Sequence, residues 1–326
     1  MLEAYGLSVN AFVLVLSLIV LERAIDLTIV NVVKISNITG YGKTTIGFIL
    51  VAFCTSLPAL SVSVFSAIGE QNIGVAIGNA LGSTIVNICL VLGVCLILVA
   101  LKGSGNVKLL PSMAKEEMRS LYFGLFMGSI IPLTLIYIGY ASKVVGIILL
   151  VIFVLYTYQL SRVRTVEEAP SGEEKRNLRK YALLTLTGII VVIIVSYFIV
   201  DTASYIAVSF GIQPVVIGGT IVALGTSIPI LMAGVYSVRK GLSDLALGNI
   251  VGSSFIDTTL ILGAILVISP LNVDIVAFSS LVVFSVISNL FLWYFLSSEK
   301  IGWREGVILL SIYLLFLTIN FSGYGV

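Results

Sequence analysis

The stretch IGFILVAFCTSLPAL (residues 46–60) has a close copy later in the chain, IGGTIVALGTSIPIL (residues 217–231). Both copies lie in long apolar segments, and each carries Thr-Ser-x-Pro at its centre. A proline inside a helix donates no backbone hydrogen bond, and its ring clashes with the carbonyl four residues earlier, here that of Cys54 or Gly225. An ordinary proline kink would explain one copy. Two matched copies with hydroxyl groups beside each proline instead predict an ion or substrate site between two interrupted helices, near the middle of a membrane.

The composition is that of a membrane protein with several spans. The chain has 326 residues, of which 59% are hydrophobic and only 10% are charged, and its mean hydropathy is +1.16. No soluble fold has that balance. Stretches of spanning length occur ten times along the chain. We expect transmembrane helices at about residues 8–33, 44–69, 73–101, 119–140, 143–161, 180–208, 213–239, 242–268, 273–297 and 302–322.

The basic residues of the loops predict the orientation. If the N-terminus lies outside, the inner loops receive nearly all lysines and arginines, and the outer side receives Lys143 alone. Arg23 then lies in the first helix, towards its inner end. We therefore expect a multi-pass protein of the cell membrane with both termini outside and the central loop in the cytoplasm. The net charge of +2 follows from this bias and does not indicate nucleic-acid binding.

The second half of the chain repeats the first. Aligning IGNALGSTIVN (residues 77–87) with LGNIVGSSFID (residues 247–257) pairs like positions of two helices. Five helices in each half would turn the second half upside down relative to the first, which is an inverted-topology repeat. The predicted fold is therefore all-α, with ten transmembrane helices in two inverted five-helix repeats and with helices 2 and 7 broken at Pro58 and Pro229.

This repeat also divides the chain. The first five-helix repeat takes residues 1–160 and the second, inverted repeat takes residues 181–326. Between them, residues 161–180 form the most charged and least apolar stretch, which we expect to be a cytoplasmic linker.

Polar side chains near the two prolines offer oxygen atoms. The set comprises Thr55, Ser56, Ser83, Asn87, Thr226, Ser227, Ser253 and Asp257. Backbone carbonyls freed by the prolines, in residues 52–55 and 223–226, would add to it. Such a site suits hard cations: sodium, calcium, magnesium, or a proton carried on the carboxylate. Asp257 is the only carboxylate of the set, and an acid inside a membrane suggests function, although a structural acid hydrogen-bonded to Ser or Asn is the alternative.

Other chemistries find little support in the sequence. The chain has no histidine, and the spacing of Cys54, Cys89 and Cys95 fits no zinc motif, so we expect free thiols. The run Gly-Lys-Thr at residues 42–44 resembles a phosphate-binding loop but lacks the earlier glycine and the preceding strand. We expect no enzyme activity and no cofactor, because neither a nucleophile–base set nor a metal-ligand cluster is present in the sequence.

The doubled TS-x-P and GN-x-x-GS segments resemble the two α-repeats of the cation/calcium exchanger superfamily, and most of all the compact microbial sodium/calcium exchangers. The resemblance covers nearly the whole chain. It implies alternating access around four central cation sites. The residues that it implies as cation ligands are Ala52 and Ala223 through their carbonyls, Thr55, Ser56, Thr226 and Ser227, Ser83 and Ser253 at the sodium sites, and Asn87 and Asp257 at the middle site.

The chain departs from this family at two positions. In the family each TS-x-P is followed by a glutamate that binds calcium, whereas this chain has Ala59 and Ile230 there. Calcium takes about six to eight oxygens and usually several negative charges. With Asp257 alone, a dehydrated divalent ion would keep an uncompensated charge, at a penalty of several kcal/mol. The sequence therefore favours a monovalent cation, sodium above all, or a proton on Asp257.

Three functions stay open from the sequence. The first is a cation antiporter of the exchanger fold with altered selectivity, such as sodium against protons. The second is ordinary sodium/calcium exchange in which Glu22, Asp26 or Asp201 substitutes for the missing acids. The third is a relative that does not transport and serves as a membrane assembly or regulatory subunit. The expected partners are the lipid bilayer and monovalent or divalent cations, and no oligomer is required.

Overall fold

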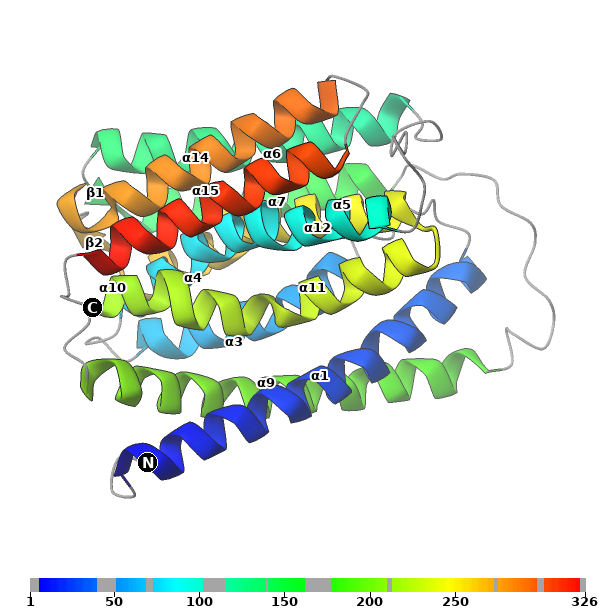
Figure 1. The fold of residues 1–326 in the computed structure, drawn as a ribbon, viewed down its shortest axis with the longest axis horizontal. Coiled ribbons are helices and arrows are strands. Elements are labelled where there is room, and N and C mark those ends of the chain that lie inside the picture. The colour runs from blue at the N-terminus through cyan, green and yellow to red at the C-terminus, as the bar shows by residue number, and fades with distance from the viewer. Residues whose placement is uncertain are drawn as a thin grey trace.

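The computed structural model of the chain describes residues 6–39, 51–68, 73–101, 115–138, 140–161, 177–209, 213–272, 275–297 and 302–322. These residues are almost wholly helical (Figure 1). In this part of the chain seven helices are long and apolar enough to cross a membrane, and two shorter apolar helices accompany them. Helices dominate because every backbone polar group within lipid must find its partner inside the segment.

The helices follow the apolar stretches of the sequence. In the first half they are α1 (Gly6–Thr39), α3 (Ala52–Ile68), α4 (Ile73–Ile85), the π-helical segment η4 (Val86–Leu92), α5 (Gly93–Leu101), α6 (Lys115–Ile138) and α7 (Lys143–Ser161). In the second half they are α9 (Leu178–Ser209), α10 (Pro214–Ile217), the π-helical segment η5 (Gly218–Val222), α11 (Ala223–Arg239), α12 (Ser243–Ile256), the π-helical segment η6 (Asp257–Ile261), α13 (Leu262–Ile268), α14 (Ile275–Ser297) and α15 (Trp303–Phe321).

The helices pack in layers. Helices α1 and α9 lie along each other and form an outer layer against α3 and α11 (Figure 1). On the other side of α3 and α11 lie α4 and α12, and beyond these come α6, α7, α14 and α15. The helices α3, α4, α11 and α12, which carry the repeated motifs, are therefore at the centre of the molecule. Outward-facing side chains of the bundle, such as Phe12 and Tyr137, are apolar and exposed, as a surface in lipid requires.

Glycines let the two halves approach closely. A Cβ atom at Gly78 would collide with the carbonyl oxygen of Val215, and one at Gly218 would collide with that of Val75. Helix α4 therefore packs backbone against backbone on η5, which small residues permit in membrane helices. This contact joins the first half to the second next to the repeated motifs.

Two features of the fold differ from the sequence expectation. The fold is not purely α-helical, because Tyr140–Ala141 (β1) pairs antiparallel with Leu271–Asn272 (β2). Two connections that meet outside the helices satisfy their backbone groups in this way. The expected break at each proline is not seen either: α3 continues through Pro58 and α11 continues through Pro229.

Side-chain hydroxyl groups and a π-helical turn accompany the prolines instead. The Thr55 hydroxyl lies 2.9 and 3.2 Å from the carbonyl oxygens of Val51 and Ala52, about two turns before Pro58. Before α11 the backbone takes the wider π-helical geometry of η5. The π-helical turn of η5 and the Thr55 contacts therefore lie on the N-terminal side of the prolines, and the helices themselves continue through Pro58 and Pro229.

The predicted linker is described only at its ends. Residues 162–176 lie outside the described part of the chain, and α9 begins at Leu178, so the last residues of the predicted linker are helical.

Candidate cation site

Two matched hydrogen bonds tie the halves together at their motifs. Thr55 Oγ1 on α3 donates to Asn249 Oδ1 on α12 at 3.0 Å. Thr226 Oγ1 on α11 donates to Asn79 Oδ1 on α4 at 2.9 Å. Each bond therefore joins a Thr-Ser-x-Pro helix of one half to a Gly-Asn helix of the other. All four side chains are buried, so the convergence that the sequence predicted between the two motifs is present in the structure.

Asn79 and Asn249 are site residues that the sequence reasoning did not select. Each follows the glycine of a repeated Gly-Asn pair, and each lies four residues before a predicted ligand, on the same helix face. Ser83 Oγ donates to Asn79 Oδ1 at 3.4 Å, and Ser253 Oγ lies 3.5 Å from Thr55 Oγ1. The presence of a Gly-Asn pair in both motifs was the sequence signal that could have identified Asn79 and Asn249.

A second contact between the halves involves the predicted acid. Asn87 Nδ2 donates to Asp257 Oδ2 at 3.0 Å, and both side chains are wholly inaccessible. Asn87 lies in η4 and Asp257 begins η6, so both belong to π-helical segments, a geometry that is common at functional sites. Among the residues whose burial is described, Asp257 is the only buried carboxylate.

Four oxygen atoms of the predicted ligand set have no hydrogen-bond partner although they are buried. They are Ser56 Oγ, Ser227 Oγ, Asn87 Oδ1 and Asp257 Oδ1. Buried polar atoms are nearly always satisfied, and leaving one unpaired costs about 1–3 kcal/mol. Each half contributes two of the four, from corresponding positions. All four are oxygen atoms of the kind that hard cations accept as ligands.

The two predicted carbonyl ligands are also buried and partly engaged. The Ala52 carbonyl accepts from Thr55 Oγ1 at 3.2 Å, and the Ala223 carbonyl accepts from Thr226 Oγ1 at 3.3 Å. Each carbonyl also belongs to the first residue of its helix, so the backbone N–H four residues later is a second partner within α3 or α11.

The residues that directly follow the two prolines are buried and uncharged. Ala59 and Ile230 are both 1% exposed, and the Ala59 carbonyl accepts from Asn79 Nδ2 at 3.1 Å. Of the acids weighed as substitutes, Asp26 on α1 is exposed and Asp201 on α9 is half-buried, both in the outer layer. The side chain of Glu22 lies outside the described part. In the buried set, therefore, Asp257 supplies the one acidic group.

Other metal chemistry is not supported by the described residues. Within them, no three histidine, cysteine, aspartate or glutamate side chains come together as a metal site. The three cysteines are buried free thiols, as the sequence predicted.

Buried oxygens and one acid, contributed by two matched helix pairs of a multi-pass membrane protein, are what a membrane cation antiporter requires. The comparison with known families agrees. The sodium/calcium exchanger protein family matches residues 9–161 and 180–322, and the chain belongs to that family.

Similar proteins span nearly the same length. The inner membrane protein YrbG of Escherichia coli is 30% identical over 81% of this chain and 82% of its own. The sodium/calcium exchanger MaX1 of Methanosarcina acetivorans is 29% identical over 97% of this chain and 99% of its own. The solved structure of the sodium-calcium exchanger NCX_Mj, soaked with 10 mM Na+ and zero Ca2+, matches with a TM-score of 0.73 and 27% identity, covering 96% of this chain and 99% of that one.

Proposed function

We propose that this antiporter exchanges sodium for protons at Asp257, by alternating access, and that its selectivity has moved away from calcium. The observation that carries the proposal is the set of four unpaired buried oxygens, which belong to Ser56, Ser227, Asn87 and the one buried carboxylate among the described residues, Asp257. The wider ligand set is the ten residues Ala52, Thr55, Ser56, Ser83, Asn87, Ala223, Thr226, Ser227, Ser253 and Asp257. These residues bind transported cations as substrates, and the proposal needs neither a catalytic residue nor a resident cofactor.

Charge balance supports a monovalent substrate. The pair formed by one sodium ion and the Asp257 carboxylate has no net charge, and neither has the carboxyl group when it carries one proton. A calcium ion beside the same carboxylate keeps one positive charge in a buried site, where an unbalanced unit charge interacts with its surroundings at several kcal/mol even at a moderate dielectric. Because sodium and the proton neutralise the same group in turn, we propose a one-for-one, electroneutral exchange.

The repeat supports the alternating-access part of the proposal. We propose ten spans in two inverted repeats, with residues 1–160 and 181–326 as the units and 161–180 as the cytoplasmic linker. Three observations support it: the matched bonds of Thr55 and Thr226, the two stretches over which the family matches, and the start of α1 at the same end of the bundle as the end of α15 (Figure 1). An even number of spans in the cell membrane, with the basic loops inside, would leave both termini outside.

The two Thr–Asn bonds at the centre would then be strained to different degrees during alternating access. Each Thr–Asn bond joins one half to the other, so a rocking motion that opens the site to one side strains one bond of the pair more than the other. Since all the proposed ligands belong to one chain, a second copy is not required.

Sodium/calcium exchange is the second candidate. It is favoured by the names of the relatives, because MaX1 and NCX_Mj are both called sodium/calcium exchangers. Under this candidate the second acid would have to come from outside the buried set described above, since Ala59 and Ile230 supply none.

Transport in proteoliposomes tests the proposal. Purified protein is reconstituted with an internal pH-sensitive dye, and sodium is added outside. We expect internal alkalinisation that depends on the sodium gradient and is unchanged when valinomycin and potassium clamp the membrane potential. Sodium entry without proton movement, or a rate that follows the membrane potential, would contradict electroneutral sodium/proton exchange.

A further inference from the structure

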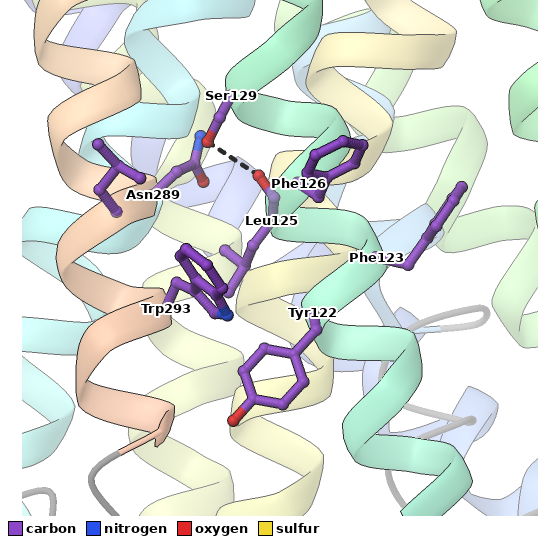
Figure 2. Close-up of a pocket in the computed structure, with 8 residues that line it drawn as sticks. Tyr122, Phe123, Leu125, Phe126, Ser129, Asn289 and Trp293 are labelled. Atoms are coloured by element: carbon purple, nitrogen blue, oxygen red, sulfur yellow. Dashed lines mark hydrogen bonds between the residues drawn. The ribbon is translucent and has the colours of Figure 1, made fainter.

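A cavity lies between α6 and α14, at the edge of the bundle and apart from the candidate cation site (Figure 2). It has a volume of about 390 Å3. That volume lies within the range of small-molecule sites, which are typically apolar with a few well-placed polar groups. Its walls include Tyr122, Leu125 and Phe126 from α6 and Leu290 and Trp293 from α14. None of its lining residues belongs to the proposed cation ligands.

One polar side chain in this cavity is buried without partners. Asn289 is 1% exposed, and neither its Oδ1 nor its Nδ2 has a hydrogen-bond partner. The amide points across the cavity towards Ser129 on α6 (Figure 2). Gly128 makes room for it, because a Cβ atom there would lie 3.1 Å from Asn289 Nδ2. An unsatisfied amide in an apolar environment is costly, so the site is built for a ligand that both donates and accepts a hydrogen bond.

The cavity opens towards the bilayer. Phe126, Leu290 and Trp293 line it and are 56%, 48% and 53% exposed, on helices whose outer faces are apolar. Asn289 lies eight residues before the end of α14 at Ser297, which places it about 12 Å along the helix from that end. At such a depth a charged group is expensive, whereas an uncharged hydroxyl is tolerated.

A second copy of the chain fits this surface poorly. A helix of another copy could cover Leu290 and Trp293, but a helix about 10 Å wide cannot enter a cavity of about 390 Å3. A small molecule dissolved in the membrane can enter the cavity, which Asn289 lines.

We propose that this cavity binds an uncharged single-chain amphiphile from the bilayer, whose hydroxyl group donates to Asn289 Oδ1 and accepts from Asn289 Nδ2. The apolar chain lies against Leu125, Phe126 and Trp293. The proposal is independent of the transported ion.

Trp293 gives a direct measurement of binding. The chain has two tryptophans, so a Trp303→Phe variant keeps Trp293 as the only one. This variant is placed in phosphatidylcholine nanodiscs, and its fluorescence is titrated with ω-bromoundecanol, whose bromine quenches indole, or with bromoundecane, which lacks the hydroxyl. We expect saturable quenching by the alcohol, and quenching by the bromoalkane that rises without saturation.

Substitution of the amide tests the contact itself. Asn289→Leu should weaken the saturable binding of ω-bromoundecanol about tenfold or more, because two hydrogen bonds are lost. Gly128→Ala, which crowds the amide, should weaken it in the same direction. Ser285→Ala is the matched control, because Ser285 is buried and unpaired on the same helix but does not line the cavity. This variant should bind ω-bromoundecanol as tightly as the parent does.

The thermal unfolding temperature of each variant shows whether it has folded, and Gly128→Ala provides the test if Asn289→Leu does not fold. Equal quenching by the two probes, or unchanged saturable binding in folded Asn289→Leu or Gly128→Ala protein, would overturn the proposal. The proposal would also be overturned if neither probe quenched Trp293 and chemical crosslinking showed that a second copy of the chain covers this residue.

Discussion

The two halves of the molecule carry matching motifs but differ in the polar groups beside them. In the first half Asn79 Nδ2 donates to the Ala59 carbonyl at 3.1 Å and to Ser63 Oγ at 3.0 Å. In the second half Asn249 Nδ2 has no partner, and the position that corresponds to Ser63 is Gly234. The first half is therefore internally braced, and the second half leaves a buried donor unpaired.

The charge is unequal as well. Asn87 of the first half is neutral, whereas its counterpart Asp257 is an acid, and the two meet at 3.0 Å. The repeat thus supplies matching helices and hydroxyl groups, while a single difference between the halves supplies the charge. We infer that this difference, more than the shared motif, decides which ion is transported.

Removing the charge should have the largest effect. Asp257→Asn makes both halves neutral at this position and leaves the central site without a group that sodium or a proton can neutralise. We expect sodium-driven proton flux in proteoliposomes to fall to the level of protein-free vesicles. Ser61→Ala, on the outer part of α3, is the control and should transport normally. Flux within a few-fold of wild type in folded Asp257→Asn protein would mean that the acid is structural.

Adding charge to both halves should change the substrate. Ala59→Glu combined with Ile230→Glu places an acid after each proline and raises the negative charge of the site from one to three. We expect calcium binding to appear, or to strengthen by at least tenfold, because calcium favours several carboxylates. Isothermal titration calorimetry measures it, with wild type as the comparison. The absence of calcium heat in a folded double variant would contradict the alignment of the two motifs.

Breaking one Thr–Asn bond at a time should lower the free energy of unfolding by a different amount for each bond. Thr55→Val leaves Asn249 Oδ1 unpaired among the described contacts, whereas Thr226→Val leaves Asn79 Oδ1 with its Ser83 contact. We expect both to lower the free energy of unfolding, with Thr55→Val costing about 1–3 kcal/mol and Thr226→Val less. Thermal unfolding in detergent measures the difference, and the reverse order would show that the first half is not the better braced.

Removing the brace of the first half should have the smallest effect. Ser63→Ala takes one acceptor from Asn79 Nδ2 but leaves the Ala59 carbonyl, so the first half comes to resemble the second. We expect a loss of about 0.5–1.5 kcal/mol with transport retained. The same unfolding assay, run beside Ser61→Ala, detects this loss. A Ser63→Ala variant that folds normally but does not transport would instead assign Ser63 to the transport site.

The sequence predicted the helices and the central residues for physical reasons that are local. Spanning length and apolar composition mark helices such as α12–α13, and a repeated Thr-Ser-x-Pro is visible without any knowledge of packing. Asn79 and Asn249 were missed because a buried asparagine is recognised as important only when its partner across the interface is known. The π-helical geometry at Asn87 and the β1–β2 pair also depend on segments that are far apart in the chain. No local sequence pattern therefore predicts them.

The continuity of α3 through Pro58 has a similar explanation. The ring removes one hydrogen bond, but whether the helix breaks there also depends on the helices packed around it. Here α3 packs against α4, α9, α11 and α12, which are mostly distant in the sequence. The sequence therefore located Pro58 within an apolar helix, whereas the predicted break was not seen.

Sodium/proton exchange at Asp257 is tested most directly by calcium uptake into proteoliposomes loaded with sodium, measured with radioactive calcium beside sodium-driven proton flux in the same preparation. We expect proton flux but no calcium uptake above that of protein-free vesicles, because the single carboxylate of Asp257 balances a single positive charge. Sodium-driven calcium uptake that is absent in Asp257→Asn would contradict this expectation, and would show that this site holds a divalent ion with Asp257 as its only buried acid.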